Sequence, residues 1–349
     1  MFNDILQKIQ DSYYKKLPFV AYRKPHSYEL SAMFMQSNTL RYANDFSESG
    51  FVFSPFDAEE KTILFPLEKS VFLTESISLE EKYDSKKSLA DGVLDKDFHI
   101  NLVKKTIQKI TTSELKKIVI SRKEKLALVD FNFVKTFVQL LENYQNAFVY
   151  VWFHPKVGLW LGATPETLLN IKNRKFKTMS LAGTQVYQNS SKVTWGKKEL
   201  EEQQLVTDFI KSQLQSISSA LKIDKTKTVK AGNLLHLKTN VEGELNKNAS
   251  LASLIRGLHP TPAVCGLPRN LAKDFILENE NYHRSFYTGF LGELNFENQQ
   301  SSLFVNLRCM EISDNTASIY IGGGITKESI AEKEFQETVS KAKTMKNVL

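Results

Sequence analysis

The sequence of 349 residues is poor in cysteine, proline and glycine, of which it contains 2, 9 and 15. So little glycine and proline excludes collagen-like and low-complexity chains, and a hydrophobic content of 42% excludes a disordered one. The two cysteines, Cys265 and Cys309, favour a reducing cytoplasm, although they leave one disulfide possible. We expect a globular, cytoplasmic chain that forms either two lobes or one large enzyme-sized domain.

Several motifs are also absent. The longest apolar runs, such as residues 148–153, reach about a third of the roughly 20 residues that a membrane helix needs. The N-terminal stretch carries Asp4 and only short apolar segments, which does not match a signal peptide. There is no G-x-G-x-x-G or Walker loop, no zinc-ligand spacing and no Ser-His-Asp or Cys-His arrangement. The sequence therefore predicts no membrane partner and no nucleophile of these classes.

Charge is unevenly distributed along the chain. Of 46 basic and 39 acidic side chains, residues 1–100 hold 12 and 16, which leaves 34 and 23 for the remainder. The net charge is +7 overall, −4 in the first part and +11 in the second. The basic part fits either a solvated lysine-rich surface or a polyanionic partner. Because the lysines are scattered and no nucleic-acid-binding motif occurs, we expect no nucleic-acid partner.

The hydrophobic patterning predicts helices and strands grouped separately, which is typical of an α+β protein with antiparallel sheets. Short strands are expected over residues 17–80, and the polar stretch 75–97 is a candidate linker that separates a variable N-terminal region, 1–97, from a catalytic domain, 98–349. Strands are expected at 116–121, 148–153, 157–163, 226–230, 234–244, 285–295, 302–311 and 316–323. Helices are expected at 2–14, 98–112, 131–143, 197–222, about 249–256, up to about 279, and 327–346.

Two of the predicted helices carry paired glutamates three residues apart. These are Glu199 and Glu202 on one helix and Glu334 and Glu337 on the last. Residues at this spacing share a helical face, and carboxylates that point inward from two helices are suited to Mg²⁺. The alternative is ordinary surface pairing, as between Glu337 and Lys341.

Four further residues are candidates for a site, each with a plainer alternative. Lys117 opens an apolar strand and is either an exposed edge residue or a buried base. Arg308 follows the alternation of a strand over 302–311 and either grips a carboxylate or lies on a solvated face. Glu166 follows a proline turn and is either a protonated acid or a cap. His236 in a strand is more often a satisfied sheet histidine than a catalytic one.

Taken together, the ordered motifs resemble those of the chorismate-utilising enzymes, which include isochorismate, salicylate, anthranilate and aminodeoxychorismate synthases. Nine blocks in the same order carry the resemblance over residues 100–349: KIVISR (117–122), GATPETLL (162–169), SLAGT (180–184), Glu199-x-x-Glu202, HLKTNVEG (236–243), HPTPAVCGLP (259–268), YHRSFYTGFLG (282–292), NLRCMEI (306–312), and GGGIT (322–326) with EFQETVSK (334–341). The resemblance implies two large antiparallel sheets packed as a sandwich with helices outside.

The resemblance also implies roles. Lys117 would be the base that activates water, and Glu166 the acid that protonates the leaving hydroxyl of chorismate. Glu202 and Glu337, with Glu199 and Glu334 beside them, would hold Mg²⁺. The substrate-binding residues would be Tyr287, Arg308, Gly322, Gly323, Gly324, Lys341, His236, Thr184 and Ala263.

Two positions distinguish activities within this family. Lys117 stands where anthranilate synthases lack a lysine, and Ala182 stands where aminodeoxychorismate synthases carry a nucleophilic one. The resemblance therefore favours isochorismate synthase first and salicylate synthase second. We expect no amidotransferase subunit and a monomeric chain. It does not choose between menaquinone and siderophore pathways. Gln203 replaces a histidine common after the metal-binding glutamate, and Cys265 replaces a small residue, where it could be a packing thiol.

Overall fold

A computed structural model describes residues 3–78, 96–187, 193–231, 234–296 and 299–349 of the chain. Within them lie seven α-helices: α1 (Asn3–Tyr14), α2 (Lys96–Thr111), α3 (Phe133–Asn143), α4 (Lys197–Gln215), α5 (Leu251–Leu258), α6 (Arg269–Asn279) and α7 (Ala331–Lys346). One short 3-10 helix, η1, covers Leu67–Lys69. None of the described helices is both long and apolar enough to cross a membrane.

The described strands form two nine-stranded antiparallel sheets. The first has the order β14 (Gly266–Leu267), β6 (Lys117–Ala127), β18 (Thr316–Ile325), β17 (Cys309–Ser313), β8 (Gly158–Thr164), β7 (Phe148–His154), β1 (Phe19–Arg23), β2 (Glu29–Met35) and β5 (Ser70–Ser76). The second has the order β11 (Ser218–Ile223), β13 (Leu234–Leu245), β10 (Lys175–Val186), β9 (Thr167–Lys172), β16 (Gln300–Val305), β15 (Phe290–Phe296), β3 (Gly50–Ser54) and β4 (Ile63–Pro66), with β12 (Lys227–Ala231) paired to β13.

The two sheets pack face to face around an aromatic core. Strand β7 shows why its sequence is continuously apolar. Phe148, Tyr150 and Trp152 point into the core between the sheets, whereas Val149 and Val151 point outward against helices. A strand buried on both faces has no polar side to display. The predicted α+β sandwich is therefore confirmed.

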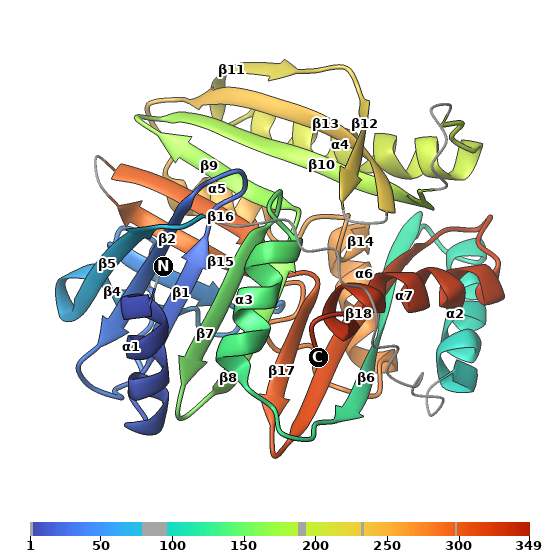
Figure 1. Cartoon of the computed structure of the whole chain (residues 1–349). Helices are drawn as coiled ribbons and strands as arrows, with labels where there is room; N and C mark the ends of the chain where they lie inside the picture. The colour runs from blue at the N-terminus through green and yellow to red at the C-terminus, as the bar shows by residue number, and fades with distance from the viewer. Residues whose placement is uncertain (1–2, 79–95, 188–192, 232–233, 297–298) are drawn as a thin grey trace.

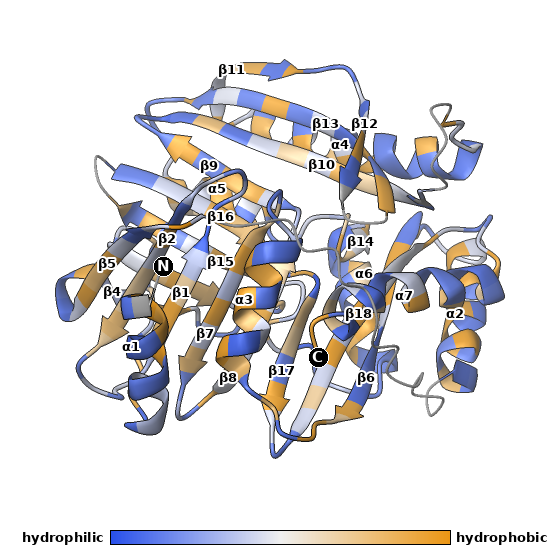
Figure 2. Cartoon of the chain, viewed as in Figure 1, coloured by the Kyte–Doolittle hydropathy of each residue, from blue (hydrophilic) through white to orange (hydrophobic). Residues whose placement is uncertain are grey.

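Helices cover the outer faces of both sheets. Buried residues of α1, α3 and α7 pack on the first sheet, and those of α4 and α5 pack on the second. In Figure 1, α1 and α3 lie over the first sheet and α4 lies with β10–β13. Figure 2 shows both hydrophilic and hydrophobic residues on α1 and α3, as expected of helices with one buried side.

The N-terminal region contributes to both sheets. Strand β1 pairs with β7, and β3 pairs with β15, so residues before 97 are part of the same sandwich. Most of the stretch expected to be a linker, 79–95, lies outside the described residues. The division of the chain at 97/98 therefore stays a prediction.

Several predicted elements were wrong in extent. The strand expected over 116–121 continues to Ala127. The helix expected over 197–222 ends at Gln215, and Ile217 and Leu221 of its predicted stripe lie beyond it, Leu221 within β11. The strand expected over 285–295 begins at Phe290. The strand expected over 302–311 is interrupted between Val305 and Cys309, where the chain leaves the second sheet and enters the first.

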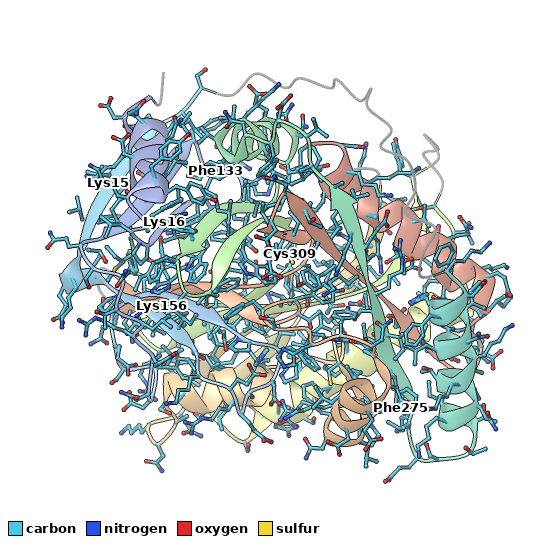
Figure 3. The ribbon with its side chains drawn as sticks, turned by 90° about the horizontal axis from the view of Figure 1, so that it is seen from below. Lys15, Lys16, Phe133, Lys156, Phe275 and Cys309 are labelled. Carbon is cyan, nitrogen blue, oxygen red and sulfur yellow. The ribbon has the colours of Figure 1, made fainter. Side chains whose placement is uncertain are left out.

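Both cysteines are buried and free. Figure 3 places Cys309 in the middle of the packed interior, with the exposed Lys15, Lys16 and Lys156 towards the margins. Cys265 packs with α2, α6 and β6, which agrees with the packing role considered for it.

Candidate active site

Glu166 and Arg308 lie where the chain crosses from one sheet to the other. Glu166 stands between the end of β8 in the first sheet and the start of β9 in the second. Arg308 stands on the return, between β16 and β17. The two crossings lie side by side, because the backbone N–H of Val305 donates to the carbonyl of Glu166 at 3.0 Å. The sandwich thus places an acid and a guanidinium at one point between its sheets.

The interruption at Arg308 corrects the expected strand alternation. Arg308 has φ of +47°, a left-handed conformation that lies outside the region of regular β-strands. Its carbonyl accepts from the N–H of Ala163 at 3.0 Å, which fixes the turn against β8. Arg308 is not on a solvated sheet face, since it is half-buried and lines the same cavity as Glu166. Burial lowers the pKa of its guanidinium, while Tyr287, Glu337 and Glu166 oppose that effect.

Glu166 is a buried carboxyl, with 3% of the residue exposed. Burial raises its pKa from 4.5 to about 8, although the positive charges of Lys117, Arg308 and Lys341 act in the opposite direction. At neutral pH the side chain is therefore mainly protonated. A carboxyl that is protonated at neutral pH can donate a proton to a leaving group.

Lys117 is completely buried at the start of β6. Its Nζ lies 2.8 Å from Oε1 of Glu202, outside hydrogen-bonding geometry, and no other described atom accepts from it. The alternative of an exposed edge lysine is therefore wrong. The neighbouring strand β18 makes room for this pair with Gly324, where a Cβ would lie 2.4 Å from Oε1 of Glu202 and 2.8 Å from Cε of Lys117.

The predicted metal-binding carboxylates approach the same place from α4 and α7. Glu202 and Glu337 both line the cavity that contains Glu166. Glu337 pairs with Lys341 at 2.6 Å, and Lys341 also donates to the carbonyl of Gly322 at 2.9 Å. Although burial would raise the pKa of Glu337, Lys341 holds it below its ordinary value. This pair is part of the cavity wall and is not an ordinary surface pair.

Glu334 and Glu199 lie beside the cavity and do not line it. Oε2 of Glu334 and Oε1 of Glu337 are each 3.8 Å from the position that a Cβ on Gly323 would take. Glu334 is buried and bonded to Lys198. Glu199 is half-buried and lies against Gly183.

His236 is oriented by a β-bulge in the neighbouring strand. The register of β10 and β13 shifts between Ala182 and Thr184, at Gly183, whose φ is +62°. The Nδ1 of His236 lies 3.1 Å from the carbonyl of Gly183 and 3.3 Å from Oγ1 of Thr184, while its buried Nε2 has no protein partner among the described residues. Burial lowers the pKa of His236 to about 3, so the ring is neutral. It is more than a satisfied sheet histidine, because one ring nitrogen stays available in the cavity.

All nine residues expected to bind substrate line one cavity. They are Tyr287, Arg308, Gly322, Gly323, Gly324, Lys341, His236, Thr184 and Ala263. Their assembly is a structural observation, and their individual roles stay predictions.

The sequence reasoning missed Tyr320 and did not recognise the structural role of Gln203. Tyr320 lines the cavity and stacks on Tyr287, with ring centroids 5.5 Å apart, and its hydroxyl donates to Glu311. Its only signal was its place just before the three glycines of β18. Gln203 was noticed only as a departure from relatives, but its Oε1 accepts from the N–H of Ala182 at 2.9 Å and so joins α4 to β10.

The carboxylates fit the chemistry of Mg²⁺. Among the described parts of the chain, no three His, Cys, Asp or Glu side chains converge into a cage. Mg²⁺ does not need one, because it commonly takes one or two carboxylates and completes its shell with water and substrate oxygens. Glu202 and Glu337 offer such oxygens at the cavity, and Glu334 offers another beside it.

Comparisons with known proteins agree with this arrangement. The profile of the family described as "Chorismate binding enzyme" matches residues 57–349. The chain belongs to this family. It is 30% identical over 264 residues to the isochorismate synthase MenF of Escherichia coli strain K12, a match that covers 73% of this chain and 61% of that protein. It is 32% identical over 195 residues to the isochorismate synthase DhbC of Bacillus subtilis strain 168, covering 53% of this chain and 49% of that protein.

The matched segments thus amount to about half to three fifths of these chorismate-binding relatives. The crystal structure of DhbC from Bacillus anthracis superposes with a TM-score of 0.82 at 24% identity, covering 98% of this chain and 99% of that one. The structure of MenF from Escherichia coli gives a TM-score of 0.78 at 23% identity, covering 95% and 88%. These two likenesses show the fold.

Proposed function

We propose that this protein is an enzyme, an isochorismate synthase that converts chorismate to isochorismate with Mg²⁺. The observation that carries the proposal is the state and place of Glu166, a buried carboxyl whose pKa is raised to about 8 and which lines one cavity with the cationic side chains of Arg308 and Lys341. A dianionic substrate suits those cations, and a hydroxyl leaving group needs the proton that Glu166 holds.

Lys117 and Glu166 divide the proton transfers between them. Lys117 would act as the base, and its Nζ takes a proton from water as the water oxygen bonds to C2 of chorismate. The ring double bonds shift, the C4–O bond breaks, and Glu166 gives its proton to the departing hydroxyl, which leaves as water. Atoms balance, since one water enters and one leaves.

The remaining residues bind and orient the substrate. Arg308 suits the enolpyruvyl carboxylate, because a guanidinium pairs with a carboxylate through two parallel hydrogen bonds. Glu202 and Glu337 would hold Mg²⁺, which when bound supplies positive charge to the ring carboxylate. The three glycines of β18 let the backbone approach both carboxylates of the substrate, because none of these glycines carries a side chain into the cavity.

Water, and not an amine, is the nucleophile in this proposal. Ala182 is buried, lines the cavity, and stands where aminodeoxychorismate synthases carry a nucleophilic lysine. Lys117 supplies the base that water requires. Both features support isochorismate over aminated products. Salicylate synthase stays the second candidate, because such an enzyme eliminates pyruvate from isochorismate in the same pocket.

The test is incubation with chorismate and Mg²⁺ followed by chromatography of the products. Isochorismate alone supports the proposal, whereas salicylate with pyruvate supports the second candidate. Matched reactions with EDTA, with ammonium, and without protein separate metal dependence, amination and spontaneous decay of chorismate. Absence of any turnover in the complete reaction would contradict both candidates. A monomeric state, a cytoplasmic location, the absence of an amidotransferase subunit and the choice of pathway stay predictions.

A further inference from the structure

The proposed reaction gives no role to Lys198, a charged residue beside the proposed metal-binding carboxylates. It is the second residue of α4 and lies four residues before Glu202, on the same helical face. Its ammonium group donates to Oε1 of Glu334, which lies on α7. The side chain therefore connects the two helices that carry the proposed metal-binding carboxylates.

Each carboxylate of this cluster, defined as Glu202, Glu334 and Glu337, has its own lysine. Glu202 lies 2.8 Å from Lys117, Glu337 lies 2.6 Å from Lys341, and Glu334 is paired with Lys198. Lys341 lines the cavity, and Lys117 is the proposed base. The pairing of Lys198 has no such explanation.

The Lys198–Glu334 pair is not an ordinary surface pair. Its side chains are 22% and 3% exposed. Glu334 and Glu337 both approach Gly323, and each has one oxygen 3.8 Å from the position that a Cβ there would take. The ammonium group of Lys198 therefore neutralises a buried carboxylate that adjoins the proposed metal-binding oxygens.

We propose that the ammonium group of Lys198 is the internal counter-cation of the Glu202–Glu334–Glu337 cluster, and that a divalent cation binds there in competition with it. The inference rests on the metal site put forward under the proposed function. Glu334 is 3% exposed, so without a partner its charge would be costly in the metal-free protein. The side chain of Lys198 is 22% exposed, and its flexible stem can carry the ammonium group to solvent when a metal takes over.

The neighbouring lysine provides a matched control. Lys197 is also on α4 and pairs with Glu201 at 3.6 Å, but its side chain is 89% exposed. Such a surface pair contributes little and does not reach the cluster. Lys197→Gln therefore removes the same charge from the same helix turn without changing the proposed counter-cation.

The experiment measures Tm as a function of Mg²⁺ concentration, in the absence of chorismate, for wild type, Lys198→Gln, Lys198→Arg and Lys197→Gln. In EDTA we expect Lys198→Gln to melt below wild type, and its half-maximal Mg²⁺ concentration to be lower by about threefold or more, because a competing charge is gone. Lys198→Arg keeps the charge and should resemble wild type, as should Lys197→Gln.

Unchanged or weaker Mg²⁺ binding by Lys198→Gln would overturn the inference. If that variant is unfolded in EDTA, near-ultraviolet circular dichroism should return on adding Mg²⁺, and a variant that stays unfolded contradicts the inference. A wild-type Tm that does not respond to Mg²⁺ would instead refute the proposed metal site itself, so the two failures are distinguishable.

Discussion

Replacement of Glu166 by glutamine changes one buried carboxyl into a neutral group of the same shape. In the folded protein the pKa of Glu166 is about 8, above its ordinary value of 4.5, because the side chain is removed from water. A group with a raised folded pKa stabilises the protein fully below its unfolded pKa, and this contribution is lost as the pH rises through the folded pKa. A glutamine cannot ionise, so the Glu166→Gln variant does not lose stability in this way as the pH rises.

The expected size follows from the difference between the two pKa values. Each unit corresponds to about 1.4 kcal/mol, so ionising Glu166 costs the folded wild type on the order of 5 kcal/mol above about pH 8. For a chain of this length that is a difference in Tm of roughly 7 °C. We therefore expect the Tm of Glu166→Gln relative to wild type to increase between about pH 5 and about pH 9.

The assay is thermal unfolding by circular dichroism over this pH range, with product analysis in parallel. Glu166→Gln should form no isochorismate, and the wild-type rate should fall above about pH 8 as the proton donor is lost. Glu124→Gln is the control, because Lys346 and Arg122 hold the pKa of the buried Glu124 below its ordinary value. Its stabilising contribution is lost only in acid, so its Tm difference should stay constant from about pH 6 to about pH 9. Parallel Tm curves for wild type and Glu166→Gln would refute the reasoning, and retained turnover in Glu166→Gln would refute its role as acid.

Two further predictions concern Lys117 and Glu202, which lie against Gly324 of β18. Lys117→Ala should abolish isochorismate formation while its far-ultraviolet circular dichroism stays that of wild type, because Glu202 keeps some access to solvent; normal turnover would rule out Lys117 as base. Gly324→Ala should reduce turnover by about a hundredfold and lower the Tm, since its Cβ would lie 2.4 Å from Glu202. Gly323→Ala should keep the wild-type Tm, because its Cβ would meet nothing nearer than 3.8 Å, and equal Tm values for the two alanine variants would contradict this account.

The secondary structure could be predicted where an element keeps the same neighbours along its whole length. Strands β7 and β8 and helices α3 and α7 were found within a few residues because their apolar patterns persist from end to end. The interrupted strand at Arg308 could not be found in this way. Leu303 and Val305 pack on the outer face of the second sheet, and Cys309 packs between the sheets, so the apolar pattern continues across the crossing. Periodicity does not record which sheet a strand joins.

The same limit explains the helix predicted to reach residue 222. Ile217 and Leu221 continue the spacing of Val206 and Ile210, but they pack against the same core from beyond the helix end, Leu221 from strand β11. Because α4 and the following strand β11 pack against the same hydrophobic core, their apolar residues look in the sequence like one continuous helical stripe. The end of α4 at Gln215 is decided by pairing of β11 with β13, which is a contact between distant segments.

The sequence by itself determined the inventory of the site. It supplied the lysines, glutamates, arginine and glycines, their order along the chain, and enough motif to predict the family. What only the tertiary structure decided is the state of those groups: that Lys117 is fully buried, that three carboxylates each face a lysine, and that Glu166 holds a proton at neutral pH. The physical reason is that a charge responds to its distance from water and from other charges, and both are set by two sheet crossings and two helices that are far apart in the chain.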